Sequence, residues 1–434
     1  MRKALPIFLG VYALILVLLI PSKPLWVDEI IDLTGVRAAS DVNGVLAFVP
    51  GNAGGVPLGY LLDFGMIRVF GYSIAAVRFP SVLFTVLTCA GVFILARQTG
   101  LKWPMVAAVA YAVSPITLRF ALEARPYAQA ACWSVFASVV FLSLARRPSV
   151  GKAAGYAALV AAGLYTQPYS IFVPLAHLLW LVFARRKPQT ILLAGTAVAL
   201  ASLAFLPWFL KIHSAWQGAV NSGVRFAVSG KDLLVIPHEL MGTGYIGAGL
   251  ALIAVVLAVG WSSLPTEQKL FWVIYAAVPL ILVPAADATF GYFLAARQLI
   301  FVLVPISILI AACMQVNRWA LLIPAALLIA MVYEDLRWVR RPGEGWQAAA
   351  AQLREAGCVI FIPGGARTMY AYFEPRLLEC NESALTPFES IALAVSPDQP
   401  ASAVDESREK LNQSGFRKVA DLRTADPRIE LYRK

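Results

Sequence analysis

Two adjacent carboxylates follow the first long apolar run of this chain. The stretch PLWVDEIIDLTGVR, residues 24–37, carries Asp28 and Glu29. A carboxylate held at a membrane surface can take a proton from an attacking hydroxyl or amine, so the pair is a candidate for general-base chemistry. The same residues also fit the first turn of an interfacial helix, where the helix dipole stabilises acidic side chains by roughly a few tenths of a kcal/mol each.

Several charged residues lie at the outer membrane surface, where the positive-inside rule predicts few cations. They are Arg78, Arg119, Glu123, Arg125 and Arg297. Ionisable groups at membrane depth are costly and are functional candidates by default, although any single arginine can instead extend its stem to the headgroups. A set on one face beside two acids favours a site. Because arginine pairs bidentately with phosphate, we expect an anionic lipid headgroup there.

Other polar positions have a structural alternative. In LRFALEARPYAQA, residues 118–130, Arg119 and Glu123 are four apart and can form an ion pair on one helical turn. The stretch LYTQPYS, residues 164–170, predicts a tight external turn in which Gln167 could meet a sugar, but tyrosines are common at membrane interfaces.

The histidines give no catalytic or metal-binding pattern. His177 lies within an apolar run, and we interpret it as a hydrogen-bonded structural residue. His213, His238 and Glu239 lie in a polar segment but lack the spacing of a metal-binding motif, so no metal site is predicted.

Composition excludes an ordinary water-soluble protein. Of 434 residues, 59% are hydrophobic and 14% charged, and the mean hydropathy is +0.72. The apolar runs are continuous and reach roughly 20 residues, which indicates membrane-spanning helices rather than a barrel. The net charge of +11 does not indicate nucleic-acid binding, because no basic module with interleaved aromatic residues accompanies it.

About eleven spans are predicted from the apolar runs. They cover residues 4–20, 76–96, 104–118, 126–145, 153–168, 170–184, 190–210, 246–261, 270–286, 294–313 and 319–333. Basic residues fall in alternate connections, which places those connections and the N-terminus in the cytoplasm. The first run lacks a signal-peptide cleavage site and is expected to stay as a span.

The connections on the other side are longer. Residues 56–71 carry Asp63 and Arg68 and are expected to form a helix in the outer interface rather than a span. A second long external loop is expected between residues 211 and 245.

The chain divides into a membrane domain, residues 1–333, and a small extracytoplasmic α/β domain, residues 334–434. In the second domain, EGWQAAAAQLREAG and DESREKLNQSG predict helices, and CVIFIP and RIELYR predict strands. Cys358 and Cys380 can pair if this domain lies outside the cytoplasm, or they can remain free thiols.

Taken together, several ordered stretches resemble the integral-membrane GT-C glycosyltransferases that use polyprenyl-phosphate sugars, the broad group of protein O-mannosyltransferases and the lipid A aminoarabinose transferase. They are LWVDE, PLGYLLDFGMIRVFGYSIAAVRFPSVLFTVL, SPITLRFALEARPYA, LYTQPYS and RQLIFVLVPISILIAA. The resemblance covers about three quarters of the chain and implies a helical membrane fold with surface helices in the first external loop. Relatives often have histidine where this chain has Gln167.

The resemblance implies transfer of a sugar from a polyprenyl phosphate in the inner or plasma membrane to an extracytoplasmic lipid, glycan or protein. In this interpretation Asp28 is the base, Glu29 orients the acceptor or the loop, and the configuration at C1 inverts. Phosphate is a good leaving group, so a second carboxylic acid is not required. No soluble cofactor is implied. The remaining site candidates are Arg78, Arg125 and Arg297 for the lipid phosphate, and Glu123, Tyr127 and Gln167 for the sugar or acceptor.

Two other function classes fit part of the pattern. A transporter or flippase for a lipid-linked or anionic solute would also use many spans and arginines. The charged residues gather at one face, however, and do not line a route through the midplane. A non-catalytic relative that binds a lipid-linked sugar is the third possibility, and the intact Asp28 and Glu29 pair disfavours it.

Overall fold

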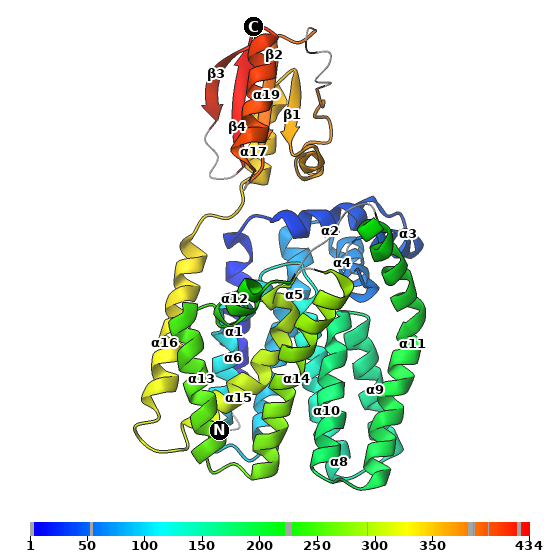
Figure 1. The fold of residues 1–434 in the computed structure, drawn as a ribbon, viewed down its shortest axis with the longest axis vertical. Helices are drawn as coiled ribbons and strands as arrows, with labels where there is room; N and C mark the ends of the chain where they lie inside the picture. The colour runs from blue at the N-terminus through cyan, green and yellow to red at the C-terminus, as the bar shows by residue number, and fades with distance from the viewer. Residues whose placement is uncertain are drawn as a thin grey trace. The chain divides into compact units, whose positions relative to one another are not determined.

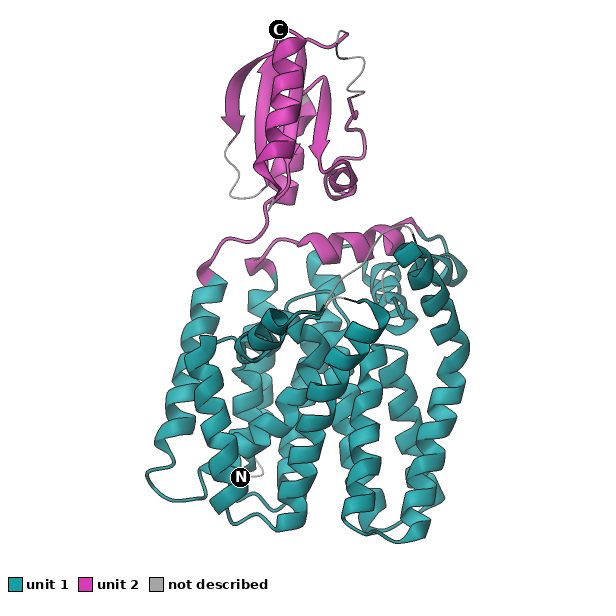
Figure 2. Cartoon of the chain, viewed as in Figure 1, with its two compact units in different colours: residues 1–20, 39–339 teal, residues 21–38, 340–434 magenta. Residues whose placement is uncertain are grey.

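The computed structural model describes residues 4–52, 55–221, 228–292, 294–380, 385, 387–397, 399–422 and 427–434. These residues form two compact units, coloured separately in Figure 2. The first, the helical unit, comprises residues 1–20 and 39–339. The second, the sheet unit, comprises residues 21–38 and 340–434, so it includes a segment from near the N-terminus. The predicted domain division after residue 333 stays a prediction.

The helical unit consists of α-helices joined by short 3-10 turns (Figure 1). Its helices are α1 Ala4–Leu19, α3 Val42–Phe48, α4 Pro57–Phe70, α5 Ile74–Gln98, α6 Pro104–Ala112, α7 Pro115–Ala121, α8 Tyr127–Arg146, α9 Val150–Leu164, α10 Phe172–Phe183, α11 Pro188–Asn221, α12 Gly230–Met241, α13 Gly244–Trp261, α14 Thr266–Phe290, α15 Leu303–Cys313 and α16 Leu322–Arg340. The turns are η1 Ile20–Ser22, η2 Val49–Gly51, η3 Pro168–Ile171 and η4 Ala296–Val302.

The protein is a polytopic helical membrane protein. Within the described residues, seven helical segments are long and apolar enough to span a membrane, and an eighth results if α6 and α7, which meet at 64°, form one broken span. The other three predicted spans correspond to α9, α10 and α16, of which α9 and α10 are shorter apolar helices. The total of eleven spans therefore stays a prediction. Helix α4 has 14 residues and is not among the candidate spans, as expected for residues 56–71.

The expected loop between residues 211 and 245 is largely helical, so that expectation is wrong. Helix α11 continues to Asn221, because the buried indole of Trp216 donates from Nε1 to the carbonyl oxygen of Phe290 at 2.8 Å. Helix α12 then begins with a capping box between Ser229 and Asp232. Polar composition had hidden both helices.

Helix α15 occupies the most buried position in the helical unit. All its residues except Ile306 are buried, and it packs against α6, α13 and α14. A helix that is apolar on every side is stable only when other helices surround it. Helices α5, α8, α9 and α11 pack successively beside one another (Figure 1).

His177 is a structural residue, as the sequence indicated. Its imidazole is fully buried in α10, and its two nitrogens hydrogen-bond the hydroxyls of Ser138 at 3.1 Å and Tyr156 at 2.9 Å. A buried ring nitrogen without a hydrogen-bond partner would be costly, and here both nitrogens have one. The residue therefore joins α8, α9 and α10.

The sheet unit contains a four-stranded mixed sheet in the order β1-β2-β4-β3. Its strands are β1 Cys358–Ile362, β2 Ser390–Val395, β3 Arg417–Leu422 and β4 Arg428–Arg433. Strands β1 and β2 are parallel and the other pairs antiparallel. Helix α19, Ala401–Gln413, buries Val404 and Leu411 in the core formed with the sheet. The unit also contains α17 Trp346–Gln352, η5 Leu353–Glu355, η6 Gly364–Ala366 and α18 Arg367–Ala371.

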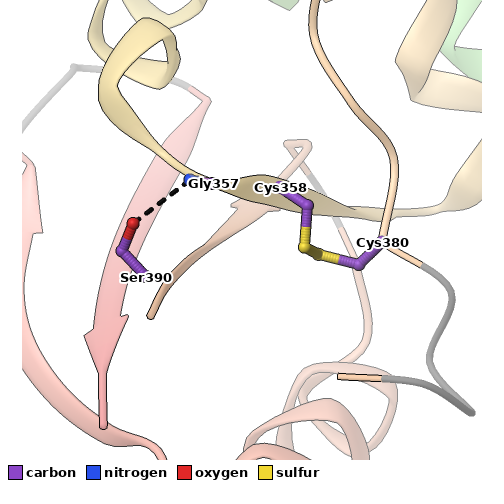
Figure 3. The surroundings of a disulfide bond; sticks show 4 residues. All are labelled: Gly357, Cys358, Cys380 and Ser390. Carbon is purple, nitrogen blue, oxygen red and sulfur yellow. Dashed lines mark hydrogen bonds between the residues drawn. A yellow bond between two sulfur atoms is a disulfide. The ribbon is translucent and has the colours of Figure 1, made fainter. Parts of the chain in front are cut away.

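Cys358 and Cys380 form a disulfide (Figure 3). The segment around Cys380 also pairs with β1, because the Cys380 N–H donates to the carbonyl of Val359 at 2.9 Å. At the start of β1, the N–H of Gly357 donates to the hydroxyl of Ser390 at 3.1 Å. Both open alternatives for the cysteines are thereby resolved in favour of pairing. The disulfide covalently fastens the segment that covers the outer edge of the sheet.

Helix α2, Val27–Ala38, belongs to the sheet unit and is held by the residues that precede α17. The N–H of Val27 donates to Oε2 of Glu344 at 2.9 Å, and Nε1 of Trp346 donates to the same oxygen at 2.5 Å. The ammonium of Lys23 donates to the carbonyl of Arg341. Burial, with a smaller effect of the Arg341 charge, lowers the pKa of Lys23.

Glu430 on β4 is a buried acid that binds three neighbouring side chains of the sheet unit. The side chain of Glu430 is 5% exposed and accepts hydrogen bonds from Arg408 Nε at 3.0 Å and from the Tyr432 hydroxyl at 2.8 Å. Lys418 lies 3.2 Å from its Oε1. Burial raises the pKa of Glu430, but the three donors outweigh burial and bring it down to about 2.

The stability of the sheet unit is expected to decrease as the pH is lowered, because of Glu430. Its folded-state pKa lies below that of an unfolded glutamate, about 4.3. Its contribution, on the order of 2–3 kcal/mol, is therefore complete above that value and is lost as pH falls toward 2. The substitution Glu430→Gln should remove most of it at pH 7 and roughly half as much at pH 3, because about 1.4 kcal/mol is lost per pH unit between the two pKa values. Pulse proteolysis of the full-length protein across a urea series measures the difference in unfolding free energy between wild type and variant, with thermolysin at pH 7 and pepsin at pH 3.

The matched control is Glu406→Gln, because Glu406 pairs with Lys410 on the same unit but is 68% exposed. This change should leave the urea midpoint nearly constant. An equal gap between wild type and Glu430→Gln at both pH values would contradict the assignment of the pH dependence to Glu430.

Removal of the Glu344 carboxylate should loosen the start of α2. In Glu344→Ala, the N–H of Val27 loses a charged acceptor at a helix N-terminus, which costs about 1–2 kcal/mol. Amide exchange in the peptide covering residues 27–38 should then rise about tenfold, because about 1.4 kcal/mol corresponds to that factor. Glu344→Gln keeps an acceptor oxygen and should give an intermediate rate. Unchanged exchange in the alanine variant would show that Glu344 does not hold α2.

Candidate active site

The two adjacent acids have different surroundings on α2. Glu29 is fully buried, and its Oε2 accepts a hydrogen bond from the N–H of Trp26 at 3.2 Å. Trp26 directly precedes the helix, so Glu29 satisfies one of the N–H groups that a helix start leaves without a partner. Asp28 is only partly buried. The helix dipole favours both charges. Of the two carboxylates, Asp28 is the more accessible to solvent.

Arg78 lies near the start of α5 and is almost wholly buried. Its side chain is 1% exposed, and Nη1 donates to the carbonyl oxygen of Ile20 at 3.0 Å. The carbonyls at the end of a helix lack partners within the helix, and the guanidinium supplies one for the turn that follows α1. Arg78 therefore joins the end of the first span to α5.

The residues between α7 and α8 form a charged bend. Glu123 is buried, and its Oε1 accepts from Arg119 Nε at 3.0 Å, which confirms the ion pair between these residues. Helix α7 ends at Ala121, so the pair bridges the end of the helix rather than one continuous turn. Nη2 of Arg125 reaches the hydroxyl of Tyr127 at 3.5 Å.

Arg297 is carried by η4, the turn that leads into the buried helix α15. Oε1 of Gln298 accepts from the N–H of Ala295 at 2.8 Å and fixes the start of η4. Turn η4 packs against α7, α8, α12, α14 and η3. Residues from distant parts of the sequence therefore converge on the segment that carries Arg297.

Tyr292 shows which of these residues are brought together. Burial raises the pKa of this tyrosine, and Tyr127 raises it further, whereas Arg125 and Arg297 lower it. Its ring contacts that of Trp216 in an edge-on arrangement at 4.7 Å between centroids. Arg125, Tyr127 and Arg297, all singled out from the sequence, thus interact electrostatically with a tyrosine that was not predicted as a site residue.

Asp287 is a second residue that the sequence analysis missed. It is fully buried in the last turn of α14, and the hydroxyl of Tyr169 in η3 donates to its Oδ1. A signal was available, because Asp287 is an acid inside an apolar run. We call the group of Arg125, Tyr127, Tyr169, Asp287, Tyr292 and Arg297 the polar cluster.

The candidate residues are divided between the two units. Asp28 and Glu29 belong to the sheet unit, whereas the arginines belong to the helical unit. Gln167 lies in the turn before η3, where its N–H donates to the carbonyl of Gly163 at 2.7 Å. The catalytic and binding roles assigned to these residues stay predictions.

The sequence of residues 56–210 matches the profile of the family described as dolichyl-phosphate-mannose-protein mannosyltransferase. This range covers α4 to most of α11 and includes Arg78, Glu123, Arg125, Tyr127 and Gln167. The comparison with curated proteins gives no match.

Solved structures share the fold along nearly the whole chain. ArnT from Cupriavidus metallidurans in the apo state superposes with a TM-score of 0.61 at 12% identity, covering 99% of this chain and 98% of that one. The same protein bound to undecaprenyl phosphate gives 0.55 at 13% identity, with 98% and 97% covered.

A third match extends the fold comparison to Archaea. The oligosaccharyltransferase AglB from Archaeoglobus fulgidus, solved with an inhibitory peptide and a dolichol-phosphate, gives a TM-score of 0.59 at 11% identity and covers 91% of this chain and 70% of its own. The family profile thus covers just over a third of the chain, and the solved structures show that nearly the whole chain shares their fold.

Proposed function

We propose that this protein transfers a sugar from a polyprenyl phosphate to an extracytoplasmic lipid, glycan or protein, with inversion at C1. The observation that carries the proposal is the packing of η4, which carries Arg297, against α7 and α8, whose connecting bend carries Arg125, in a chain that shares the ArnT fold. Two guanidinium groups in a partly buried site suit a phosphate ester. A relative with this fold, ArnT, has been solved with undecaprenyl phosphate bound.

The proposed step needs one base. A hydroxyl or amine of the acceptor attacks C1 as the bond from C1 to the phosphate oxygen breaks, and the bonding electrons leave with the phosphate. Asp28 takes the proton of the attacking group. Glu29 holds the start of α2 through its bond to Trp26 and so orients Asp28.

The arginines act on the leaving group. Arg125 and Arg297 stabilise the charge that develops on the phosphate, an effect of roughly 3 kcal/mol per well-placed donor. Arg78 is a further candidate, although one of its N–H groups is committed to Ile20. Glu123, Tyr127 and Gln167 are proposed to contact the sugar or the acceptor.

The proposed location is the inner or plasma membrane, with the N-terminus in the cytoplasm and residues 334–434 outside it. The disulfide between Cys358 and Cys380 supports an outside location, because such bonds persist in oxidising compartments.

Replacement of Asp28 tests the proposed chemistry. Asp28→Asn keeps the shape of the side chain but cannot accept a proton, so transfer should fall at least 100-fold while donor binding is retained. The measurement uses purified protein in nanodiscs, radiolabelled polyprenyl-phosphate sugars and membrane extract as the acceptor source. Asp405→Asn is the matched control, because Asp405 is 64% exposed and lies on α19. Wild-type transfer that survives in Asp28→Asn would reject Asp28 as the base, and binding without transfer by wild type would favour a transporter.

The disulfide gives an independent test of location. In intact cells carrying the wild-type protein, a maleimide mass tag should not modify Cys380 until a reductant is added. In spheroplasts carrying Cys358→Ser, a membrane-impermeant maleimide should modify Cys380 once urea has unfolded the sheet unit. Cys89 is buried in α5 and serves as an internal control that stays unmodified before detergent is added. Labelling of Cys380 only after the membrane is broken would place the sheet unit in the cytoplasm.

A further inference from the structure

The polar cluster contains a carboxylate oxygen that has nothing to accept from. The side chain of Asp287 is fully buried, and its Oδ1 accepts from Tyr169. Its Oδ2 is buried without a hydrogen-bond partner among the residues that the structure describes. A buried acceptor of this kind is costly, and the position at the negative end of the α14 dipole adds to the cost. A bound group that donates a hydrogen bond to Oδ2 would remove this cost.

Asp287 faces the same group of residues as the arginines proposed to bind phosphate. Electrostatic interactions link the hydroxyl of Tyr169 to those of Tyr292 and Tyr127. Charged residues that interact electrostatically with Tyr292 include Arg125, Arg297 and Asp287. The cluster therefore combines two guanidinium groups with one carboxylate and three phenol rings.

The guanidinium groups and the carboxylate of the cluster suit different parts of one donor molecule. A phosphate is attracted by guanidinium groups and repelled by a carboxylate, whereas a sugar hydroxyl or amino group donates to a carboxylate oxygen. The sugar is attached to the phosphate through a single oxygen, so a phosphate held by the arginines keeps its sugar within a few bonds' length. A buried acceptor oxygen without a hydrogen-bond partner can then discriminate strongly between sugars that do and do not offer it a hydroxyl or amino group.

We propose that Oδ2 of Asp287 accepts a hydrogen bond from a hydroxyl or amino group of the donor sugar, and that Asp287 with Tyr169 selects which polyprenyl-phosphate sugar is bound. This inference rests on the proposed function and deepens it. Tyr169 is a positioning residue, because its hydroxyl donates to Oδ1 and leaves Oδ2 as the oxygen that can accept from the sugar. Asp287 contributes to recognition of the donor and takes no proton in the transfer step.

The test compares glycosylated with bare lipid phosphate in a binding measurement that needs no turnover. The probes are undecaprenyl phosphate and its mannose, glucose and 4-amino-4-deoxyarabinose derivatives, each titrated into full-length protein in nanodiscs. Wild type should bind at least one glycosylated probe more tightly than undecaprenyl phosphate. Asp287→Asn replaces one acceptor oxygen by a donor and should weaken that glycosylated probe at least tenfold, with the Kd of undecaprenyl phosphate changed less than twofold.

A second variant separates recognition from a structural bond. Tyr169→Phe removes the hydroxyl that positions Asp287 but keeps Oδ2, so it should weaken the same probe less than Asp287→Asn does. Unchanged binding of undecaprenyl phosphate in both variants shows that the fold is intact. The inference is overturned if wild type does not prefer any glycosylated probe, if Asp287→Asn weakens all probes equally, or if it weakens none. The proposed function is judged separately, because it fails when wild type transfers no sugar even though sugar-dependent binding is present.

Discussion

The low polarity of the helical unit requires every buried charge to find a partner, and the arrangement of the site follows from this constraint. Arg78 illustrates it, since the nearly inaccessible guanidinium donates to the carbonyl of Ile20. Burying a cation without a partner costs far more than a surface charge does. This bond therefore fixes where the chain leaves the first span on its way to Asp28. Glu123 obeys the same constraint through Arg119.

The features that follow from local periodicity were predictable from the sequence. Continuous apolar runs predicted the helices of the helical unit, and CVIFIP predicted β1, whose five residues are all buried. Strand β3 was not anticipated, because most of its residues are exposed and its pattern does not alternate clearly. The extension of α11 was hidden by polar residues, and only Trp216 packing near the end of α14 explains it.

Contacts between distant residues could not be predicted in this way. Glu344 lies 317 residues from Val27, and Tyr169 lies 118 residues from Asp287. Nothing in a local window marks either pair, because the partners meet only after helices and strands have packed. Arg125 and Arg297 were recognisable individually as unexpected cations. That they share a tyrosine neighbour depends on η4 being placed by the buried helix α15.

Helix α2 is held at both ends by other residues of the sheet unit. Glu344 binds the first turn of α2 through Val27, and the Arg37 guanidinium lies over the ring of Tyr372 at 4.6 Å from its centroid. Both ends of the helix are thus fastened to other residues of the sheet unit, which set the position of Asp28 within that unit. A GT-C fold common to proteins of 11–13% identity does not by itself specify a substrate. In this chain the arginines proposed to bind the lipid phosphate belong to the helical unit and the proposed base belongs to the sheet unit, so substitutions in separate units test the two proposed roles.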